Sequence, residues 1–438
     1  MNAIFFGIVA VAFVVAAYHQ IVWDGTGDGA PIDALGKAMI DTAGSSVTLA
    51  LGLVGVMTLF LGLMKVGERA GLLTVIARLL RPLMTRLFPG VPADHPAMGA
   101  MIMNIAANVL GLGNAATPFG IRAMEHLDRL NPAKGTASDA MILFLAINTS
   151  SVTLLPTGVI AIRAAAGSMD PAGIVPTTLF ATLCSTTAAI LMAKFLARTS
   201  PPAVAAAAAD APLAPVDGED LPEGAGGGRG EDLPSAPSVG YPAWVSMAAL
   251  GAVVALVPLT ILYGRVIAPW IVPGLMMAFL GLGVWKRVPV YEAFIDGAKD
   301  GFDVALRIIP YLVAILVAVG MFRASGAMDL LIQPLGALTQ MVGMPPEALP
   351  MALLRPLSGS GAYGIMASII QDPAIGPDSY AGYLVSTIQG STETTFYVLA
   401  VYFGAVRIRR IRYALGAALT ADFVGVAAAV FIVSVLYG

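Results

Sequence analysis

Two short stretches of the 438-residue sequence place hydroxyl and amide side chains inside long apolar runs. The stretch NTSSVTLLP begins at Asn148, and the stretch QGSTETTFY begins at Gln389. Proline, glycine and β-branched residues weaken a helix, so backbone groups there would be free to bind a cation or a polar solute. The candidate binding residues in these stretches are Asn148, Ser150, Ser151, Gln389, Ser391, Thr392, Glu393 and Thr394. The alternative is that the hydroxyls bond back to their own helix or bridge neighbouring helices.

Glu393 is the most informative of these residues, because an unpaired carboxylate at the centre of a bilayer costs at least about 2.5 kcal/mol. Arg355 is a candidate charge partner, and Asp422, in the last apolar run, is a second deep acid that could compete for it. A protonated, neutral Glu393 is the alternative, and it could carry a coupling proton. A static ion pair that only holds two elements together is also open.

Two Gly-rich apolar segments supply further polar groups. The first runs from Pro96 to Ala116 and contains GLG, and the second runs from Leu349 to Ile370 and contains SGSG. Backbone that leaves the helix at membrane depth needs protein or water around it, so both segments are predicted to be re-entrant hairpins. Their candidate binding residues are Asn104, Asn108, Asn114, Thr117, Ser358 and Ser360. Asparagine amides at a broken tip suit a polar uncharged substrate or Na⁺, and they could equally cap the short helices.

The elements that position these residues are predicted to be membrane helices. Hydrophobic residues make up 58% of the chain and charged residues 12%, whereas soluble domains carry about 25% charged residues. Apolar runs of about 20 residues, each long enough to span a bilayer, recur along the sequence. They cover residues 4–22, 46–64, 140–161, 177–196, 245–263, 267–285, 304–322, 380–403 and 414–437. The sequence therefore predicts an all-α integral membrane protein with about nine spans, of which the first is a retained helix.

A change in composition divides the chain into two halves. Residues 200–240 are rich in Ala, Pro, Gly, Asp and Glu and are predicted to be a disordered linker between domains at 1–199 and 241–438. AMIDTAGSSVTLAL, from Ala38, aligns with AFIDGAKDGFDVAL, from Ala293, and NTSSVTLLP aligns with QGSTETTFY. The shared order of apolar, Gly-rich and hydroxyl-rich segments predicts a repeat, with chance matches between small apolar residues as the alternative.

The second repeat is predicted to be inverted in the membrane. Each half contributes three crossings, and two extra helices near 245–285 lie between the halves, so equivalent points are five crossings apart. With the N-terminus in the cytoplasm, the Lys and Arg clusters near 65–86, 122–134, 286–299 and 407–412 face the cytoplasm. The loops at 167–171 and 371–379, which lack Lys and Arg, then face outward.

Three longer motifs resemble a known family. NVLGLGNAATPFGIRAMEHLDRLNP, from Asn108, resembles spore maturation protein A. RPLSGSGAYG and GPDSYAGYLVSTIQGSTETTFYVLAVYFGAVRIRRIRYA resemble spore maturation protein B, so the two families look fused through the linker. Both are grouped with the gate, or nucleoside-recognition, domain, which is similar to parts of concentrative nucleoside transporters and of ferrous iron transport protein B. The resemblance implies a bacterial inner-membrane protein with a transporter-like core, and a link to spore-core dehydration and envelope functions.

Two functions follow from these observations. The first is secondary transport of a small polar or amphiphilic solute, nucleoside-like or envelope-related, coupled to Na⁺ or H⁺. The second is a non-transporting membrane assembly or regulatory factor in the envelope or in spore maturation. An enzyme ranks third, because the sequence lacks a Walker lysine loop, HExxH and a G-x-S-x-G elbow.

The remaining composition bears on partners. The single cysteine, Cys184, excludes an internal disulfide framework and a cysteine-based metal cluster. The three histidines, His19, His95 and His126, are expected to be interfacial or surface residues, so no cofactor or metal is expected apart from Na⁺ or H⁺ coupling. The expected partners are the lipid bilayer and a small solute, with no nucleic acid. A homodimer through the extra helices near 245–285 is a further prediction.

Overall fold

The computed structural model describes residues 2–25, 29–201, 237, 239–328, 330 and 339–438, apart from the side chains of 2–4, 113–115, 256–257, 260–269, 304–305, 307–308 and 311. The secondary structure of these residues is helical, together with one isolated β-bridge between Thr136 and Arg410. The all-α prediction is therefore confirmed. The predicted linker at 200–240 lies mostly outside the described residues.

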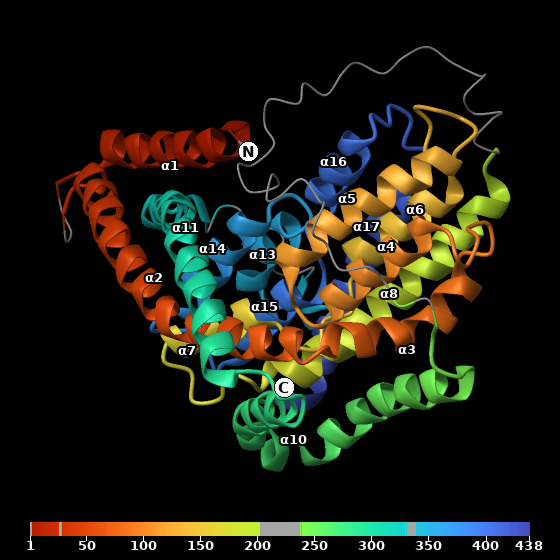
Figure 1. Cartoon of the computed structure of the whole chain (residues 1–438). Helices are drawn as coiled ribbons and strands as arrows, with labels where there is room; N and C mark the ends of the chain where they lie inside the picture. Colours follow the sequence, from red (N-terminus) through yellow and green to blue (C-terminus); the bar gives the residue numbers. More distant parts are fainter. Residues whose placement is uncertain (1, 26–28, 202–236, 238, 329, 331–338) are drawn as a thin grey trace.

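The helices follow the same order in the two halves (Figure 1). Each half has a long helix, a helical hairpin, a helix broken into two short pieces, and a final long helix. The first half contains α1 (Asn2–Val22), α2 (Pro31–Arg69), α3 (Leu72–Leu87), α4 (Pro96–Val109), α5 (Gly113–Leu130), α6 (Asp139–Thr149), α7 (Thr157–Ala165) and α8 (Ile174–Thr199). The second contains α10 (Ala243–Trp285), α11 (Val290–Ala324), η2 (Pro346–Ala348), α13 (Leu349–Leu354), α14 (Gly359–Ile370), α15 (Tyr380–Ser391), α16 (Thr395–Ala405) and α17 (Ala414–Tyr437).

The two broken helices begin with the same type of cap. The Ser138 hydroxyl accepts a hydrogen bond from the Met141 amide at the start of α6, and the Ser379 hydroxyl accepts one from the Gly382 amide at the start of α15. A serine cap satisfies a backbone amide that has no partner within its own helix. Both helices therefore start at a position that the local sequence specifies, and both stop where β-branched and hydroxyl residues accumulate.

Equivalent helices of the two halves pack against each other in antiparallel directions. Along α2 and α11, Gly62 lies against Phe294, whereas Thr42 lies against Gly320. Two glycines four residues apart, Gly297 and Gly301, bring the backbones of α11 and α2 into contact, as small residues commonly do between membrane helices.

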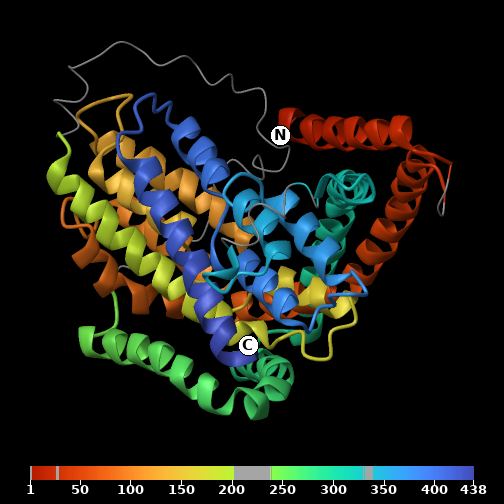
Figure 2. The same ribbon diagram turned by 180° about the vertical axis from the view of Figure 1, so that it is seen from behind.

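The final helices α8 and α17 run side by side in the same antiparallel manner (Figure 2). The Ser185 hydroxyl donates a 2.8 Å hydrogen bond to the Ala421 carbonyl, and the Tyr437 hydroxyl donates one of 2.9 Å to the Gly173 carbonyl. Antiparallel packing of equivalent helices is the arrangement that an inverted repeat requires. The inverted orientation in a membrane remains a prediction.

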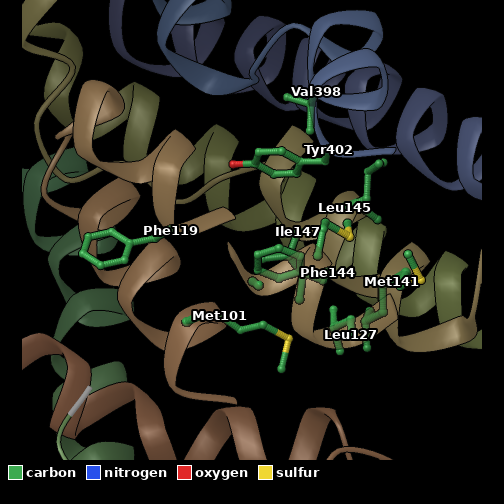
Figure 3. Close-up of a cluster of buried hydrophobic side chains, with 14 of the residues drawn as sticks. Met101, Phe119, Leu127, Met141, Phe144, Leu145, Ile147, Val398 and Tyr402 are labelled. Carbon is green, nitrogen blue, oxygen red and sulfur yellow. The ribbon is translucent and has the colours of Figure 1, made fainter. Parts of the chain in front are cut away.

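The two largest hydrophobic clusters among the described residues each contain residues of both halves. In the first, α4, α5 and α6 enclose side chains of α16, including Val398 and Tyr402 (Figure 3). The Tyr402 ring stacks on Phe144 with the ring centroids 6.1 Å apart. In the second, α2 and α7 pack with α14, α15 and α17. Each half therefore depends on helices of the other half to bury its apolar surface.

The two ends of the bundle differ in charge. At one end the loops 131–138 and 407–413 join, where the Ala137 amide donates to the Arg410 carbonyl at 2.9 Å and Arg412 pairs with Asp139 at 2.6 Å. At the other end the loops 166–173 and 371–379, which contain no Lys or Arg, join. The predicted orientation in the membrane depends on this difference, because it places the loops rich in Lys and Arg in the cytoplasm and the loops without them outside.

Some predicted elements differ from those observed. The runs 245–263 and 267–285 were expected to be two spans, but they form one 43-residue helix, α10, which bends along its length (Figure 1). Only three residues, GRV at 264–266, separate the two runs, and the helix continues through them. The second arm of the first hairpin extends to Leu130, beyond the predicted end at Ala116.

Four described helices are long and apolar enough to cross a membrane: α1, α2, α8 and α17. The predicted spans 140–161 and 380–403 are each divided into two helices that are too short to cross alone. The division agrees with the prediction of broken helices. The total of about nine spans stays a prediction.

Candidate functional site

The two helix breaks lie next to each other, although they are far apart in sequence. The Glu393 amide donates a 2.8 Å hydrogen bond to the Thr149 carbonyl, which ends α6. Gly390 packs against Pro156 at the start of α7. The structure therefore brings NTSSVTLLP and QGSTETTFY together.

Each break is also joined to the hairpin of its own half. The Leu154 amide donates a 3.0 Å hydrogen bond to the Val109 carbonyl in the first hairpin. The Phe396 amide donates one of 3.1 Å to the Pro356 carbonyl in the second. These bonds satisfy part of the backbone that the breaks leave without helical partners, as a non-aqueous environment requires.

Gly111 allows the first hairpin to approach its break this closely. Its φ of 77° is readily adopted only by glycine, and a Cβ at this position would lie 2.5 Å from the Leu155 carbonyl oxygen. The GLG motif therefore makes the turn of the hairpin and permits its contact with the broken helix.

Arg355 links the second hairpin to the second break. One of its terminal nitrogens donates a 2.9 Å hydrogen bond to the Thr394 hydroxyl, and the other donates to the Thr392 carbonyl. The same guanidinium lies 3.7 Å from the Glu393 carboxylate. Arg355 is buried, whereas the Glu393 side chain is 53% exposed, so one face of the carboxylate remains open.

Asp422 binds a different partner. Its carboxylate accepts a 2.6 Å hydrogen bond from the Thr395 hydroxyl and forms no ion pair with Arg355. Arg355 therefore pairs directly with Glu393, whereas it acts on Asp422 only as a nearby charge. Its second carboxylate oxygen is buried without a hydrogen-bond partner.

The first hairpin contributes a chain of amide and hydroxyl groups. The Asn104 side-chain amide donates to the Tyr402 hydroxyl at 3.1 Å, and this hydroxyl donates to the Asn148 side-chain oxygen at 3.3 Å. The Asn108 amide donates to the same Asn148 oxygen at 2.9 Å. Tyr402 thus joins Asn104 to Asn148, and Asn108 joins the same network through Asn148. The sequence analysis did not identify Tyr402, because an aromatic residue in a span is commonly only part of the core.

Thr117 of the first hairpin reaches the Glu393 region through Tyr397. Thr117 hydrogen-bonds the Tyr397 hydroxyl, and Tyr397 lies close enough to Glu393 to interact with its charge. Asn114 falls outside the residues whose side chains the structure describes. Thr117 is therefore the hairpin residue that links α5 to the Glu393 region.

A second tyrosine of the same half, Tyr363, binds the residue that aligns with Asn148. Tyr363 of α14 hydrogen-bonds Gln389, and its hydroxyl lies against Gly158 of α7. Gln389 is the residue that aligns with Asn148, which binds Tyr402. The side-chain oxygens of Gln389 and Asn104 are both buried without hydrogen-bond partners, so each half keeps an acceptor available.

Most of the predicted serines have local roles. The Ser150 and Ser391 hydroxyls donate to carbonyls of their own helices, Ala146 and Ile388. The Ser358 hydroxyl caps α14 by accepting from the Gly361 amide. Ser360 is exposed, and Ser151 lines an apolar cavity. For the first three serines, the structure therefore favours the alternative of local hydrogen bonding.

Arg163 forms a contact between the halves that the sequence analysis did not identify. It is fully buried and donates to the Asp378 carboxylate at 2.9 Å and to the Pro377 carbonyl at 2.6 Å. Its guanidinium also lies 4.3 Å from the centre of the Tyr383 ring. The sequence does contain a feature that predicts such a contact. Arg163 is the lone arginine in the apolar stretch VIAIRAAAG, and a charged residue there needs a buried partner.

The side chains that commonly bind a structural or catalytic metal ion are dispersed in the described part of the chain. Within the described part of the chain, no three His, Cys, Asp or Glu side chains gather closely enough to hold a metal ion together. The oxygen atoms near the breaks belong mainly to hydroxyls, amides and backbone carbonyls. These are ligands for a hard monovalent cation or hydrogen-bonding partners for a polar solute.

Comparison with known proteins identifies related sequences. The nucleoside-recognition (Gate) family matches residues 50–166 and 305–409. Spore maturation protein B of Bacillus subtilis (strain 168) is 46% identical over 167 residues, covering 38% of this chain and 93% of the relative. Spore maturation protein A of the same organism is 47% identical over 159 residues, covering 36% of this chain and 81% of the relative. These matches confirm the resemblance predicted from the motifs.

Solved structures with similar helices are more distant. CNTnw in an inward-facing, substrate-bound state is 14% identical, with a TM-score of 0.47 and coverage of 99% of this chain and 93% of that chain. The YdaH transporter of Alcanivorax borkumensis is 16% identical, with a TM-score of 0.39 and coverage of 98% and 97%.

Proposed function

This chain belongs to the Gate family of nucleoside-recognition proteins, and we propose that it is a secondary transporter of the bacterial inner membrane. Its solute is a small polar or amphiphilic molecule, nucleoside-like or envelope-related, and its transport is coupled to Na⁺ or H⁺. The chain itself is a multi-pass membrane protein, as its apolar helices indicate.

The observation that carries this proposal is the meeting of the two breaks beside Glu393. The Glu393 carboxylate is half exposed and pairs on its other side with the buried Arg355. Its exposed side can therefore bind a cation, a proton or a solute. Neighbouring hydroxyls and amides supply uncharged ligands from both halves. Broken helices at a repeat interface are the usual place for substrate and coupling-ion sites in secondary transporters.

The proposal includes a topology. Residues 1–199 and 241–438 form two gate domains of opposite orientation, joined by the linker at 200–240, with the N-terminus in the cytoplasm. The antiparallel packing of α2 with α11 and of α8 with α17 supports this arrangement. Inward rocking of one half against the other would then expose the breaks alternately to the two sides.

Ligand-dependent stabilisation of the purified protein tests the proposal. Nucleosides, amino acids, envelope precursors and Na⁺ are added to the full chain in detergent, at several pH values, and the melting temperature is recorded. A ligand at about 100 times its Kd stabilises the folded state by about 2.7 kcal/mol. We expect at least one of these additions to stabilise the wild type, and Glu393→Gln to abolish this effect.

Glu125→Gln is the matched control, because Glu125 is an exposed acid on α5. It should respond to ligand as the wild type does. Equal stabilisation of the wild type and Glu393→Gln by every addition contradicts the role of Glu393 in coupling or binding.

A non-transporting assembly or regulatory factor is the second candidate. The observation that favours it is the Arg163 contact, which locks the loops 166–173 and 371–379 of the two halves together. If this candidate is right, cells that carry Glu393→Gln should show the same envelope integrity as wild-type cells, provided that the variant folds. Arg163→Met should then impair the phenotype in proportion to the loss of folded protein.

A further inference from the structure

An apolar cavity opens beside the first half, and neither Arg355 nor Glu393 lines it. Its volume is about 380 Å³, within the range of about 300 to 1,000 Å³ that is usual for ligand pockets. Helices α3, α4, α8 and α10 and the break between α6 and α7 form its walls. The cavity therefore lies between the core of the first half and the extra helix α10.

The walls consist mainly of Leu, Ile, Val, Met and Ala side chains. Two of them on α10, Met247 and Leu250, are also exposed on the outer surface of the protein. Leu191 and Phe195 on α8, the helix that forms another wall, are also large apolar side chains exposed on the surface. In a membrane protein, such a surface faces lipid hydrocarbon.

A single charged residue, Arg86, lines this cavity. It lies in the last turn of α3 and is exposed, so it marks where the cavity reaches the surface. Among the described residues, Arg86 forms no ion pair, whereas Arg81 on the same helix binds Asp94 at 2.9 Å. The side chain of Arg86 thus adds a positive charge to the cavity lining, and within the described part of the chain no carboxylate pairs with it.

Helix α3 has the character of an interfacial helix. Leu73, Ala77 and Met84 are buried against the protein, and Arg78 and Arg86 are exposed. Basic amphipathic helices lie at the boundary between headgroups and acyl chains and attract anionic lipids. This position would place the Arg86 guanidinium at the level of lipid phosphates.

A few uncharged polar side chains also line the cavity. The Ser246 hydroxyl lines it, is 9% exposed and has no hydrogen-bond partner. Asn108 and Ser151, near the first break, also line it. The lining therefore combines one exposed cationic side chain with mainly apolar groups and a few uncharged polar ones, which suits an amphiphile.

We propose that this cavity binds an anionic phospholipid of the surrounding bilayer, with one hydrocarbon chain inside and its phosphate on Arg86. The lipid fills the space between α10 and the first half and holds α10 against α3 and α8. The proposal depends on the membrane location of the chain and not on transport. Its failure would leave the proposed transport function unaffected.

Native mass spectrometry of the detergent-purified full chain tests this site. The probe is the anionic lipid dioleoylphosphatidylglycerol. The control is dioleoylphosphatidylcholine, whose headgroup has no net charge. We expect one retained phosphatidylglycerol per chain, bound more tightly than phosphatidylcholine. Arg86→Gln should reduce this preference about fivefold, the factor that corresponds to about 1 kcal/mol for one basic residue at a lipid surface.

Two pairs of variants separate this site from nonspecific binding. Arg78→Gln removes an exposed arginine of the same helix that does not line the cavity, and it should keep the preference. Ala249→Phe fills the cavity and should lower phosphatidylglycerol binding at least tenfold, whereas Ala248→Phe, at the neighbouring position outside the lining, should not.

Several outcomes would overturn the proposal. One is equal lipid binding by Ala249→Phe and Ala248→Phe, and another is an equal effect of Arg86→Gln and Arg78→Gln. A third is a dimer that carries no lipid and dissociates in Ala249→Phe, which would identify a second copy of the chain as the occupant. Since Arg86 is exposed, Arg86→Gln should fold, so the charge comparison remains decisive if Ala249→Phe does not.

Discussion

The guanidinium of Arg355 lies 3.7 Å from the carboxylate of Glu393, and the two side chains differ sharply in burial. Arg355 is buried and also binds Thr392 and Thr394, whereas Glu393 is about half exposed. The arginine therefore has a structural role that does not depend on the acid. The acid is the member of the pair that remains free to bind something else.

We expect substitutions of these two residues to have unequal effects on stability. Arg355→Met leaves two oxygen acceptors without their donor and should lower the free energy of unfolding by about 3 kcal/mol. Glu393→Gln removes only a partly exposed ion pair and should cost less than about 1 kcal/mol. Thermal or denaturant unfolding in detergent measures both. Equal losses would show that the pair acts as a single buried unit.

The packing of Gly120 against Tyr402 gives a second prediction. A Cβ at Gly120 would lie 2.2 Å from the Tyr402 hydroxyl oxygen, so Gly120→Ala must displace the ring that links Asn104 to Asn148. The expected loss of stability is about 1 to 3 kcal/mol, typical of overpacking.

Gly404→Ala is the control, because nothing lies within 4 Å of a Cβ at this position in the neighbouring turn of α16. Alanine there should be neutral or stabilise the helix. Combining Gly120→Ala with Tyr402→Leu should cost less than the sum of the two single changes, since the smaller side chain relieves the clash. Full additivity would argue against direct contact.

Asp170, in the loop between α7 and α8, should make stability depend on pH. Burial raises the pKa of its carboxyl above the ordinary value of 3.8, and the nearby Arg163 offsets only part of this effect. A raised pKa means that the folded state binds the proton more tightly than the unfolded state does. The contribution of Asp170 to stability therefore falls as the pH rises from about 4 through the raised pKa.

Asp170→Asn should abolish this contribution. The melting temperatures of the wild type and the variant should be similar at about pH 4, and the variant should be the more stable at about pH 8. Ser168 and the Asp170 backbone remain available to Arg163 in the variant. A variant that is less stable at high pH would show that attraction to Arg163 outweighs burial.

Cysteine labelling tests the inverted orientation directly. Cys184 is the only cysteine, so Cys184→Ala provides a background for single cysteines at Asp94 and Met341, both highly exposed and each preceding one hairpin. A membrane-impermeant maleimide should label Asp94→Cys from the cytoplasmic side and Met341→Cys from the outside. Met169→Cys, in an exposed loop at the uncharged end, serves as the outside marker. Labelling of both hairpin positions from one side would rule out inversion.

Local features of the sequence predicted much of the fold. The Ser138 and Ser379 caps begin the broken helices, and the β-branched and hydroxyl residues after Asn148 and Gln389 end their first pieces. Hairpins appeared where Gly-rich motifs predicted them. Helix boundaries of this kind follow from the preferences of neighbouring residues, and these are readable without knowing the tertiary structure.

The partners of the site residues were less accessible to sequence reasoning. Arg355 was correctly paired with Glu393, since both stand in polar motifs of the same half. Asp422 binds Thr395 instead, and Tyr402 and Arg163 were not identified. A polar group in a span needs some partner, but composition does not specify which of several distant groups will be within reach.

The sequence by itself determined that this is a helical membrane protein of the Gate family, with hydroxyl-rich breaks in two apolar segments. These properties depend on hydropathy, on local helix preferences and on motifs that are continuous in the chain. Only the tertiary structure decided that Tyr402 of one half completes the Asn104 and Asn148 network of the other, and that Arg163 joins Asp378. Such contacts depend on the antiparallel packing of helices more than 200 residues apart, which fixes the distances between side chains that no local pattern relates.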